Sequence, residues 1–479
     1  MKRILSVLCL LAMLLPLCAC SSSLATEEET KTATAKTETK TETEEEEKGP
    51  IVYPDSFAVG YARIDITGSL PVPIFEAEAD KIRDPLMLTC TAVWDGEQAA
   101  LLMSADLRGM QRSVAKRSAE MIQKQFGIPV ENVIINCTHT HTAPSAGGAS
   151  DASVRWNANY YKQLPIVVEK ALRDLDEVEG VYTGKSYTEG ITFVRRYLMP
   201  DGTYDTNPGS RKVVDYESKA DPELQTLRFD RKTKKDVLMI NYQTHHAGDV
   251  PSKSVSADFI YFYREAAEEE FDMNFVYHQG AGGNVNFLCS IPGDRKYPTA
   301  EAACEGFMLT TRDALSKEEA INVGKIRSVA RDTTVTVRKE PEELVTLAKK
   351  VMAAPETERG TLAVQYGFES WRHANSTIAR SQKGETEDIP LTAVTFGDIA
   401  FCAFPYEMFD QNGKEVREAS PFKTTYICSL ANGSYGYIPT TFAFPHGTYE
   451  VNACAYVMGT GEQLAQSMVT MLNECKAAN

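Results

Sequence analysis

Five of the seven histidines in this 479-residue chain fall in three short patches. The first patch holds His139 and His141, the second holds His245 and His246, and the third is His278. Each patch follows an apolar run typical of a β-strand. Alternate residues of an extended segment point the same way, so His139 and His141 can direct two imidazoles into one cleft. Imidazole is the commonest metal ligand and carries protons near neutral pH, so the pattern predicts metal or acid–base chemistry.

Two later apolar runs end in groups that can complete a metal site. Residues 399–404 lead to Glu407, and residues 425–430 lead to Tyr437. Two imidazoles and a carboxylate leave an open position on zinc, and the metal lowers the pKa of a bound water to about 7. His139, His245 and Glu407 supply such a set, and the phenol oxygen of Tyr437 could be a further ligand. The residues therefore predict Zn²⁺ and hydrolytic chemistry.

The elements that must position these groups alternate between strands and helices. Amphipathic helices are predicted at 111–125 and 160–175, and Ser256-Ala257-Asp258 caps a third helix. Strands are predicted at residues 99–103, 133–137, 237–242, 274–277, 399–404 and 425–430. In an open α/β sheet the carboxyl ends of strands meet at one edge, where ligands bind. We therefore expect an α/β fold, a large single catalytic domain with a mixed β-sheet and flanking helices, and a metal site at the strand carboxyl ends.

The first twenty residues are typical of a bacterial lipoprotein signal peptide. Lys2 and Arg3 precede an apolar run, 4–17, that is too short to be a good membrane span. Small residues then lead to Cys20. The sequence predicts that Cys20 is lipidated and anchors the protein to a membrane, at the bacterial cell surface or in the periplasm. An ordinary signal peptide cut before a free cysteine is the alternative.

Residues 21–55 are expected to form a disordered tether. The stretch 21–50 is rich in Thr, Glu and Lys, with no aromatic residue and only Leu24 as a large apolar one, so it cannot bury enough surface to fold. Residues 56–479 then form the catalytic domain, because no second low-complexity linker or fixed-period repeat interrupts them. The formal net charge of −16 argues against a nucleic-acid partner. Disulfides are permitted outside the cytoplasm, but the sequence does not choose any pairing.

Several motifs, in order, resemble the catalytic domain of the neutral/alkaline, non-lysosomal ceramidase family. They are Val59-Gly60-Tyr61-Ala62-Arg63-Ile64-Asp65-Ile66-Thr67, Thr138-His139-Thr140-His141-Thr142-Ala143-Pro144, the turn near Gly283, Pro405-Tyr406-Glu407, Tyr437 and Tyr449-Glu450. The resemblance covers residues 57 to about 462 and implies a divergent bacterial lipoprotein member. It also implies a role in sphingolipid metabolism, with zinc-dependent cleavage of the N-acyl amide of ceramide to fatty acid and sphingosine.

The resemblance also implies residue roles. It places zinc on two histidines, a glutamate and a tyrosine: His139, His245, Glu407 and Tyr437. It puts His141 against the substrate carbonyl or the leaving amine, and Arg195 beside the site. Tyr449 would stabilise the developing oxyanion, a role that buried donors fill well.

One position departs from the family motif. Asn286 stands where the family has an active-site serine. Asparagine can donate a hydrogen bond but cannot act as a nucleophile. A zinc-bound water is compatible with that change, so we expect an extracytoplasmic zinc-dependent amidohydrolase that cleaves ceramide or a related acylated amide.

Some residue assignments stay open. His246 points away from His245 if the strand continues, so either could be the ligand. His278 could contact substrate or be structural. Asp106 lies at a strand end, where it could orient a ligand histidine or cap a helix.

Two other classes of protein also remain possible. The first is a zinc hydrolase with a different scaffold, but neither scaffold that uses His-x-His fits well. Metallo-β-lactamase-like hydrolases continue with Asp and His, whereas Thr142-Ala143-Pro144 follows here. Barrel amidohydrolases place the pair near their first strand, not some 80 residues into the domain. The last alternative is a non-catalytic or differently specific surface lipoprotein that binds a solute or lipid with the same fold. Such a protein has no need of a metal site, so metal content separates it from the enzyme.

Overall fold

The computed structural model describes residues 49–478 except 247, 252 and 288. The predicted signal peptide, Cys20 and residues 21–48 of the predicted tether lie outside the described residues. From residue 51 onward the chain forms one compact unit.

The larger of two main sheets is mixed. Within the described residues it has nine strands, with the short β20 (Glu319–Ala320) paired to β10 outside the main path. The order of the main path is β18 (Asn274–Gln279), β16 (Val237–Tyr242), β15 (Glu223–Arg231), β10 (Asp176–Tyr187), β1 (Ala58–Asp65), β5 (Met87–Trp94), β6 (Ala99–Ala105) and β8 (Val133–Cys137). The pairs β16–β18 and β6–β8 are parallel, whereas the neighbours between them are antiparallel.

The smaller sheet packs against the larger one. Its order is β21 (Ile326–Thr336), β22 (Thr386–Phe396), β23 (Ile399–Phe404) and β25 (Thr424–Ser429), and β23–β25 is a third parallel pair. Alternate residues of a strand point to opposite faces. One face of each sheet therefore joins a shared apolar core, in which Leu102 and Ile134 of the larger sheet pack with Phe401 and Tyr426 of the smaller one.

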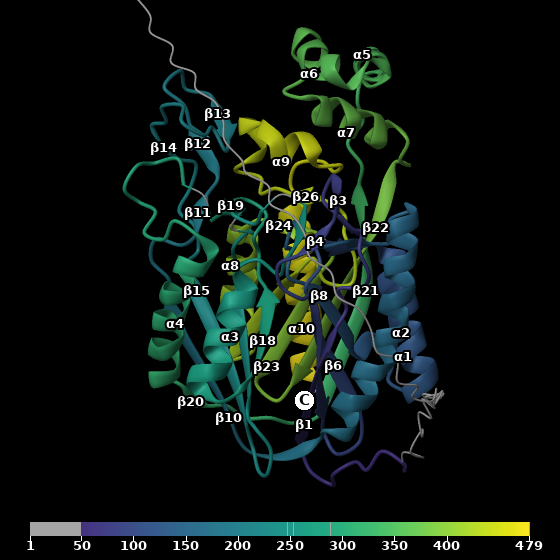
Figure 1. Cartoon of the computed structure of the whole chain (residues 1–479), viewed down its shortest axis with the longest axis vertical. Coiled ribbons are helices and arrows are strands. Elements are labelled where there is room, and N and C mark those ends of the chain that lie inside the picture. The colour runs from purple at the N-terminus through teal and green to yellow at the C-terminus, as the bar shows by residue number, and fades with distance from the viewer. Residues whose placement is uncertain (1–48, 247, 252, 288, 479) are drawn as a thin grey trace, which may run out of the picture. The chain divides into compact units, whose positions relative to one another are not determined.

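Helices cover the two outer faces, giving helix, sheet, sheet, helix layers (Figure 1). The larger sheet is covered by α1 (Arg112–Phe126), α2 (Asp151–Arg173), α3 (Phe259–Phe271) and α4 (Ala300–Ser316). The smaller sheet is covered by α8 (Asp410–Ala419) and α10 (Thr460–Ala477). The apolar stripes of these helices explain the placement, as Trp156 of α2 and Leu464 of α10 are both buried against their sheets.

Short elements surround the carboxyl ends of the parallel pairs. They include the hairpin β2 (Val72–Ile74) and β3 (Ala77–Ala79), and the pairs β4 (Lys81–Ile82) with β17 (Ser254–Val255), β7 (Gly109–Met110) with β9 (Ser145–Ala146), β11 (Phe193–Val194) with β19 (Val285–Asn286), and β24 (Glu407–Met408) with β26 (Tyr437–Ile438). A three-stranded sheet joins β12 (Arg196–Leu198), β13 (Tyr204–Thr206) and β14 (Asp215–Tyr216).

A small helical subdomain is inserted between β21 and β22. It consists of α5 (Glu342–Ala353), α6 (Glu356–Gln365) and α7 (Trp371–Ser381), which share their own apolar core. Helix α7 contacts α9 (Thr448–Ala453), and Figure 1 shows this subdomain at the same end of the fold as β24 and β26. Two short 3₁₀ turns, Val130–Asn132 and Phe444–His446, complete the described elements.

The predicted α/β class, mixed sheet and flanking helices are confirmed, and Asp258 is the N-cap of α3 as expected, accepting from the amide of Phe259. Two details differ. Helix α2 begins at Asp151, because Ser150 caps it by accepting from the amide of Ser153, so the amphipathic pattern from Tyr160 marked only its second part. The strands β23 and β25 belong to a second sheet instead of extending the first.

Candidate metal centre and active site

The three parallel strand pairs bring the candidate residues to one place. His139 and His141 follow β8, His245 follows β16, and β24 begins at Glu407 just after β23. Within the pair β24–β26, Glu407 lies opposite Tyr437. His139 has a φ of 65°, which non-glycine residues rarely adopt and which often accompanies a functional position. The predicted convergence of strand ends is therefore present in the fold.

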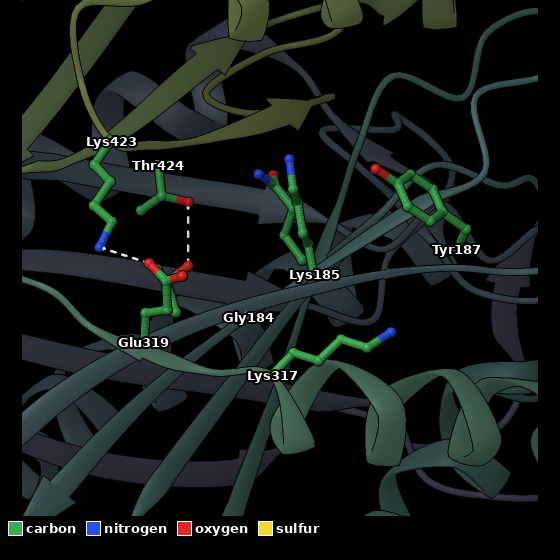
Figure 2. A pocket seen from close by; sticks show the side chains of 9 residues that line it. Gly184, Lys185, Tyr187, Lys317, Glu319, Lys423 and Thr424 are labelled. Carbon is green, nitrogen blue, oxygen red and sulfur yellow. Dashed lines mark hydrogen bonds and ion pairs between the residues drawn. The ribbon is translucent and has the colours of Figure 1, made fainter.

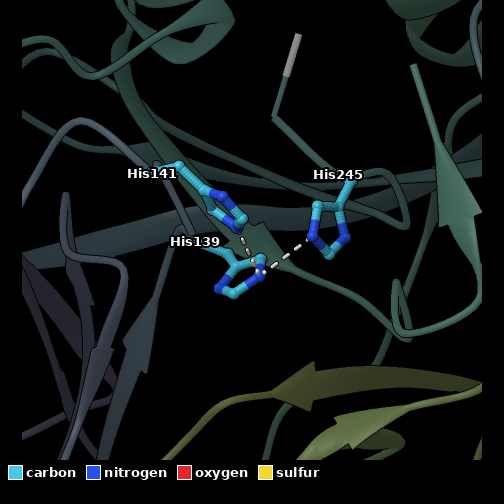
Figure 3. Close-up of side chains that lie close together, drawn as sticks. All are labelled: His139, His141 and His245. Carbon is cyan, nitrogen blue, oxygen red and sulfur yellow. Dashed lines mark hydrogen bonds between the residues drawn. The ribbon is translucent and has the colours of Figure 1, made fainter. Parts of the chain in front are cut away.

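Three potential ligand atoms lie close to Nε2 of His139. The Nε2 atom of His139 lies 3.2 Å from Nε2 of His141 and 3.2 Å from Nε2 of His245, as Figure 3 shows. It also lies 3.3 Å from Oε2 of Glu407. Tetrahedral zinc with Zn–N bonds of about 2.0–2.1 Å has neighbouring ligand atoms roughly 3.3 Å apart. The three contacts of His139 Nε2 match that spacing, and the three imidazole nitrogens all lie within 4.8 Å of one another, so the group could hold a metal ion.

The backbone sets the tautomers of two of the histidines. Nδ1 of His139 lies 2.7 Å from the carbonyl oxygen of Arg108, and Nδ1 of His245 lies 3.2 Å from that of Gly282. A carbonyl only accepts, so each Nδ1 carries the proton and each Nε2 presents a lone pair. Two lone pairs that face each other at 3.2 Å cannot form a hydrogen bond. A cation bound between them satisfies both, and such second-sphere contacts are typical of metal-binding histidines.

Burial and nearby positive charge keep the imidazoles of His245 and His141 neutral. Burial lowers the pKa of His245 well below its usual value, and the charge of Arg195 lowers it further. Burial likewise lowers the pKa of His141, with His246 as the next cause. Metal ligation requires neutral imidazole, so both rings are in the binding form at neutral pH.

Glu407 supplies an anionic oxygen. Burial would raise the pKa of this carboxyl, but His139, Tyr437 and Arg195 together lower it, and the balance falls below the usual value. Its Oε2 atom is buried and has no hydrogen-bond partner among the residues that the structure describes. A buried carboxylate oxygen that has no hydrogen bond and lies 3.3 Å from the Nε2 lone pair of His139 is in the environment expected of a metal ligand.

Tyr437 and Tyr449 form a pair of phenols at the site. Their rings meet edge to face at 5.4 Å. Burial and then Glu407 raise the pKa of both phenols. Tyr437 is buried and hydrogen bonded to Glu407, whereas Tyr449 is only partly buried. Tyr449 is thus the phenol able to donate to a bound molecule.

Arg195 lies beside His245 and is fully paired. Its Nε donates to Oε1 of Glu450 at 2.7 Å, one terminal nitrogen donates to the carbonyl of Gly283 at 2.9 Å, and the other lies 3.2 Å from Nε2 of His245. Burial lowers its pKa, but Tyr437, Glu450 and Glu407 raise it more, so the guanidinium stays charged. Arg195 therefore holds a fixed positive charge against the candidate site.

Glu450 joins two buried arginines. Its second oxygen accepts from Arg196 at 2.9 Å and from Thr206 at 2.8 Å, and Arg196 also pairs with Glu217 at 2.6 Å. The sequence motif Tyr449-Glu450 marked this position, but reasoning from the sequence assigned it no role. The arginine partners lie over two hundred and fifty residues away in the chain, so only the fold reveals them.

The glycine-rich turn passes directly beside Glu407. A Cβ atom on Gly283 would lie 2.5 Å from the carbonyl oxygen of Glu407, so this position needs glycine. The amide of Gly283 donates to the carbonyl of Met408 at 2.7 Å. The turn near Gly283 is therefore packed against the backbone of the candidate ligand Glu407.

Asn286 lies near the turn but outside the imidazole cluster. Its amide nitrogen donates to Oδ1 of Asn207 at 3.0 Å, and β19 pairs it with Phe193. None of the hydrogen bonds within the described residues joins Asn286 to His139, His141 or His245.

The residues left open by the sequence have distinct positions. Strand β16 ends at Tyr242, so His246 does not point away; its ring stacks on His141 with centroids 3.7 Å apart. His278 is buried inside β18, between the sheets, where its ring meets Phe401 at 5.7 Å. It is therefore structural.

Asp106 neither caps a helix nor contacts a candidate ligand. Its carboxylate pairs with Arg264 at 2.7 Å and accepts from the amide of Met87 at 2.9 Å. It lies 3.4 Å from the hydroxyl of Thr138, the residue before His139. Asp106 thus anchors the segment that carries the histidines.

A larger cavity lies elsewhere and lacks metal-binding chemistry. It measures about 400 Å³ and lies where β10 faces the start of β25 (Figure 2). Its lysines pair with acidic groups, Lys423 with Glu319 at 3.1 Å and Lys317 with Asp313 at 2.5 Å. The lining contains neither histidine nor cysteine. Size does not identify the site, because another cavity, of about 660 Å³ beside α5, is larger still. The chemistry favours the imidazole cluster.

No protein-family model and no curated protein matches this chain. Solved structures of ceramidases do share its fold. The neutral ceramidase from Pseudomonas aeruginosa aligns with a TM-score of 0.66 at 16% identity, over 88% of this chain and 74% of that one. A ceramidase complexed with C2 aligns with a TM-score of 0.67 at 15% identity, over 89% and 76%. The chain therefore has the fold of neutral ceramidases, in agreement with the resemblance of its motifs.

Proposed function

We propose that this protein is a zinc-dependent amidohydrolase that cleaves an N-acyl amide, either ceramide or a related acylated amide. The observation that carries the proposal is that the backbone-fixed lone pair on Nε2 of His139 lies 3.2 Å from that of His245 and 3.3 Å from the buried Oε2 of Glu407, which has no hydrogen-bond partner within the described residues. The fold shared with ceramidases supports the same class of reaction. The proposed ligands are His139, His245, Glu407 and Tyr437.

Zinc in such a site supplies a Lewis acid and a water of lowered pKa. The remaining groups act on the substrate. Tyr449 keeps its proton because its pKa is raised, so it can donate to the oxyanion that develops on the carbonyl. Arg195 contributes a fixed positive charge, which favours the same anionic species. His141 is neutral and only partly buried, so it can exchange a proton with the leaving amine.

We further propose that the enzyme acts outside the cytoplasm, anchored through a lipid on Cys20. The charged start, apolar run and small residues before Cys20 support this part of the proposal. Among the described helices, none is long and apolar enough to cross a bilayer. Palmitate or glycerol labelling of wild type and Cys20→Ala in a bacterial host tests it. Equal labelling of the two proteins would contradict the anchor.

The metal assignment is tested by measuring metal content. The chain from residue 51 onward, a compact unit, is purified and loaded with zinc. We expect about one zinc per chain in the wild type, and loss of the metal in His139→Ala and Glu407→Ala. His141→Ala should keep the metal but lose activity. His373→Ala, on α7, is the matched control and should keep both.

Activity is tested with two substrates, a short-chain fluorescent ceramide and a simple N-acyl amino acid, by release of free amine. Metal-dependent hydrolysis of either substrate supports the amidohydrolase proposal. Stoichiometric zinc without turnover of any amide would reject the reaction. Absence of stoichiometric metal would reject the site and favour a non-catalytic lipoprotein.

A further inference from the structure

A small polar cavity extends from the proposed metal site. It measures about 140 Å³, and His139 and Glu407 form one wall. The rest of the lining combines the polar side chains of Arg108, Gln111, Ser145 and Ser434 with the apolar Met110, Ala146 and Leu430. Pockets for drug-sized ligands are usually about 300–1,000 Å³. This cavity therefore fits a small polar group next to the reacting bond, and not a long alkyl chain.

Arg108 is positioned at this cavity by aromatic and polar contacts. Its guanidinium carbon lies 4.0 Å from the centre of the Phe75 ring, and one terminal nitrogen donates to the hydroxyl of Ser145 at 3.3 Å. The Phe75 ring in turn lies 5.3 Å from the ring of His141. The hairpin β2–β3 presents Phe75 at its turn, so a local element holds the guanidinium beside the site.

Arg108 lacks an anionic partner. Its Nε atom is buried without a hydrogen-bond partner, and none of the ion pairs within the described residues includes it. Other arginines nearby are paired, as Arg195 is with Glu450 and Arg112 is with Asp332. A partly buried guanidinium with unused donors is costly unless an anion binds it, and carboxylates match its planar geometry.

Arg108 adds a positive charge at the cavity that His139 and Glu407 line. Within the site, Arg108 and Arg195 balance Glu407 and Glu450, so a divalent metal would make it positive overall. The chain as a whole carries a net charge of −16. A positive site on an acidic protein attracts an anionic substrate to this point.

We propose that Arg108 binds a carboxylate of the substrate, so that the preferred substrates are amides with a carboxylate close to the scissile bond, such as N-acyl amino acids. This inference rests on the proposed amidohydrolase function. The carboxylate occupies the small cavity, while the acyl chain extends away from it. Arg108 is then a specificity-determining residue, and its carbonyl, which accepts from His139, is unaffected by side-chain substitution.

The first test measures binding without metal or turnover. The metal-free chain is titrated calorimetrically with N-hexanoylglycine and with N-hexanoylglycinamide, which differ only in the carboxylate. We expect the wild type to prefer the acid about 10- to 100-fold, as charged hydrogen bonds allow, and Arg108→Ala to lose that preference. Arg112→Ala is the control and should keep it, because Arg112 pairs with Asp332 outside the cavity. Equal affinities in the wild type, or equal losses in both variants, would overturn the inference.

The second test measures the ratio of kcat/KM for the two amides in the zinc-loaded enzyme. Arg108→Ala should lower the acid-to-amide ratio at least about tenfold, and Arg108→Lys should lower it less because one charge remains without the planar donor pair. Hydrolysis of both amides with an unchanged ratio rejects the role of Arg108 but leaves the proposed function intact. If neither amide is hydrolysed although zinc is bound, the proposed function fails, and the calorimetric preference still decides the role of Arg108.

Discussion

Substitution of His278 should change how the stability of this fold depends on pH. His278 lies between the two sheets, and neither of its ring nitrogens has a hydrogen-bond partner among the described residues. Burial lowers the pKa of His278 from 6.5 to about 4. The folded protein therefore holds the ring neutral at pH values at which the unfolded chain binds a proton.

The sign and size follow from linkage. The folded pKa is depressed, so the unfolded state takes up the proton first as the pH falls. The contribution of neutral His278 to the free energy of unfolding is fully present above pH 6.5, declines between pH 6.5 and about 4, and changes little below that. The difference between a pKa of 6.5 and one of about 4 corresponds to roughly 3 kcal/mol of unfolding free energy, at about 1.4 kcal/mol per pKa unit. Because the ring is buried, no correction for solvent screening applies.

His278→Leu removes the group that titrates and places an apolar side chain between the two sheets. At pH 7.5 we expect little change or a small gain in stability, because two unpaired nitrogens are removed. Relative to wild type, the variant should gain roughly 3 kcal/mol between pH 7 and pH 4. Guanidinium unfolding, followed by tryptophan fluorescence at several pH values, measures the difference.

Phe401→Leu is the matched control, since Phe401 contacts the His278 ring but does not titrate. Its difference from wild type should be the same at each pH. If the difference in unfolding free energy between wild type and His278→Leu is also independent of pH, the folded protein does not lower the pKa of His278, and the reasoning is refuted.

Three further perturbations follow from the site. Glu450→Gln removes the carboxylate shared by two buried arginines and should cost about 3–5 kcal/mol, seen as a lower Tm; an unchanged Tm would show that the pairing is unimportant. Gly283→Ala forces a Cβ against the Glu407 backbone and should weaken zinc affinity by about 10- to 100-fold in a competitive chelator assay. Gly360→Ala is the control, because a Cβ on Gly360 in α6 would contact nothing. This variant should keep the zinc affinity of the wild type and gain up to about 1 kcal/mol of stability, seen as a higher Tm. Chelation should lower the Tm of the wild type but not of Glu407→Ala, and an equal effect on both would argue against this ligand.

The strands and their polar ends could be predicted because the signal is local. The runs at 133–137, 237–242 and 399–404 are apolar at every or nearly every position, as strands covered on both faces must be. Polar groups at their carboxyl ends then identify the edge of the sheet where chemistry occurs. The division into two sheets could not be predicted, because both arrangements require the same apolar runs.

Contacts between distant parts of the chain could not be predicted from the sequence. His246 was expected to point away from His245 only if the strand continued, but the strand ends at Tyr242 and the His246 ring stacks on His141. Arg108 carried no signal, since its importance comes from the absence of a partner and from Phe75, thirty-three residues earlier. Unpaired charge is a property of the folded chain, and sequence patterns do not record it.

The position of His141 separates two descriptions of the metal centre. Three imidazoles converge, so spacing alone would allow His139, His141 and His245 to bind the ion together. However, His141 is partly exposed and stacks on His246 toward the solvent, whereas Glu407 is buried with an oxygen that has no hydrogen-bond partner. Burying a carboxylate oxygen that has no hydrogen bond costs more than burying a neutral imidazole, so a metal ion at this site would stabilise the fold more through Glu407 than through His141. In the proposed set of ligands, two of the three clustered imidazoles would therefore hold the ion, and His141 would be left to move a proton.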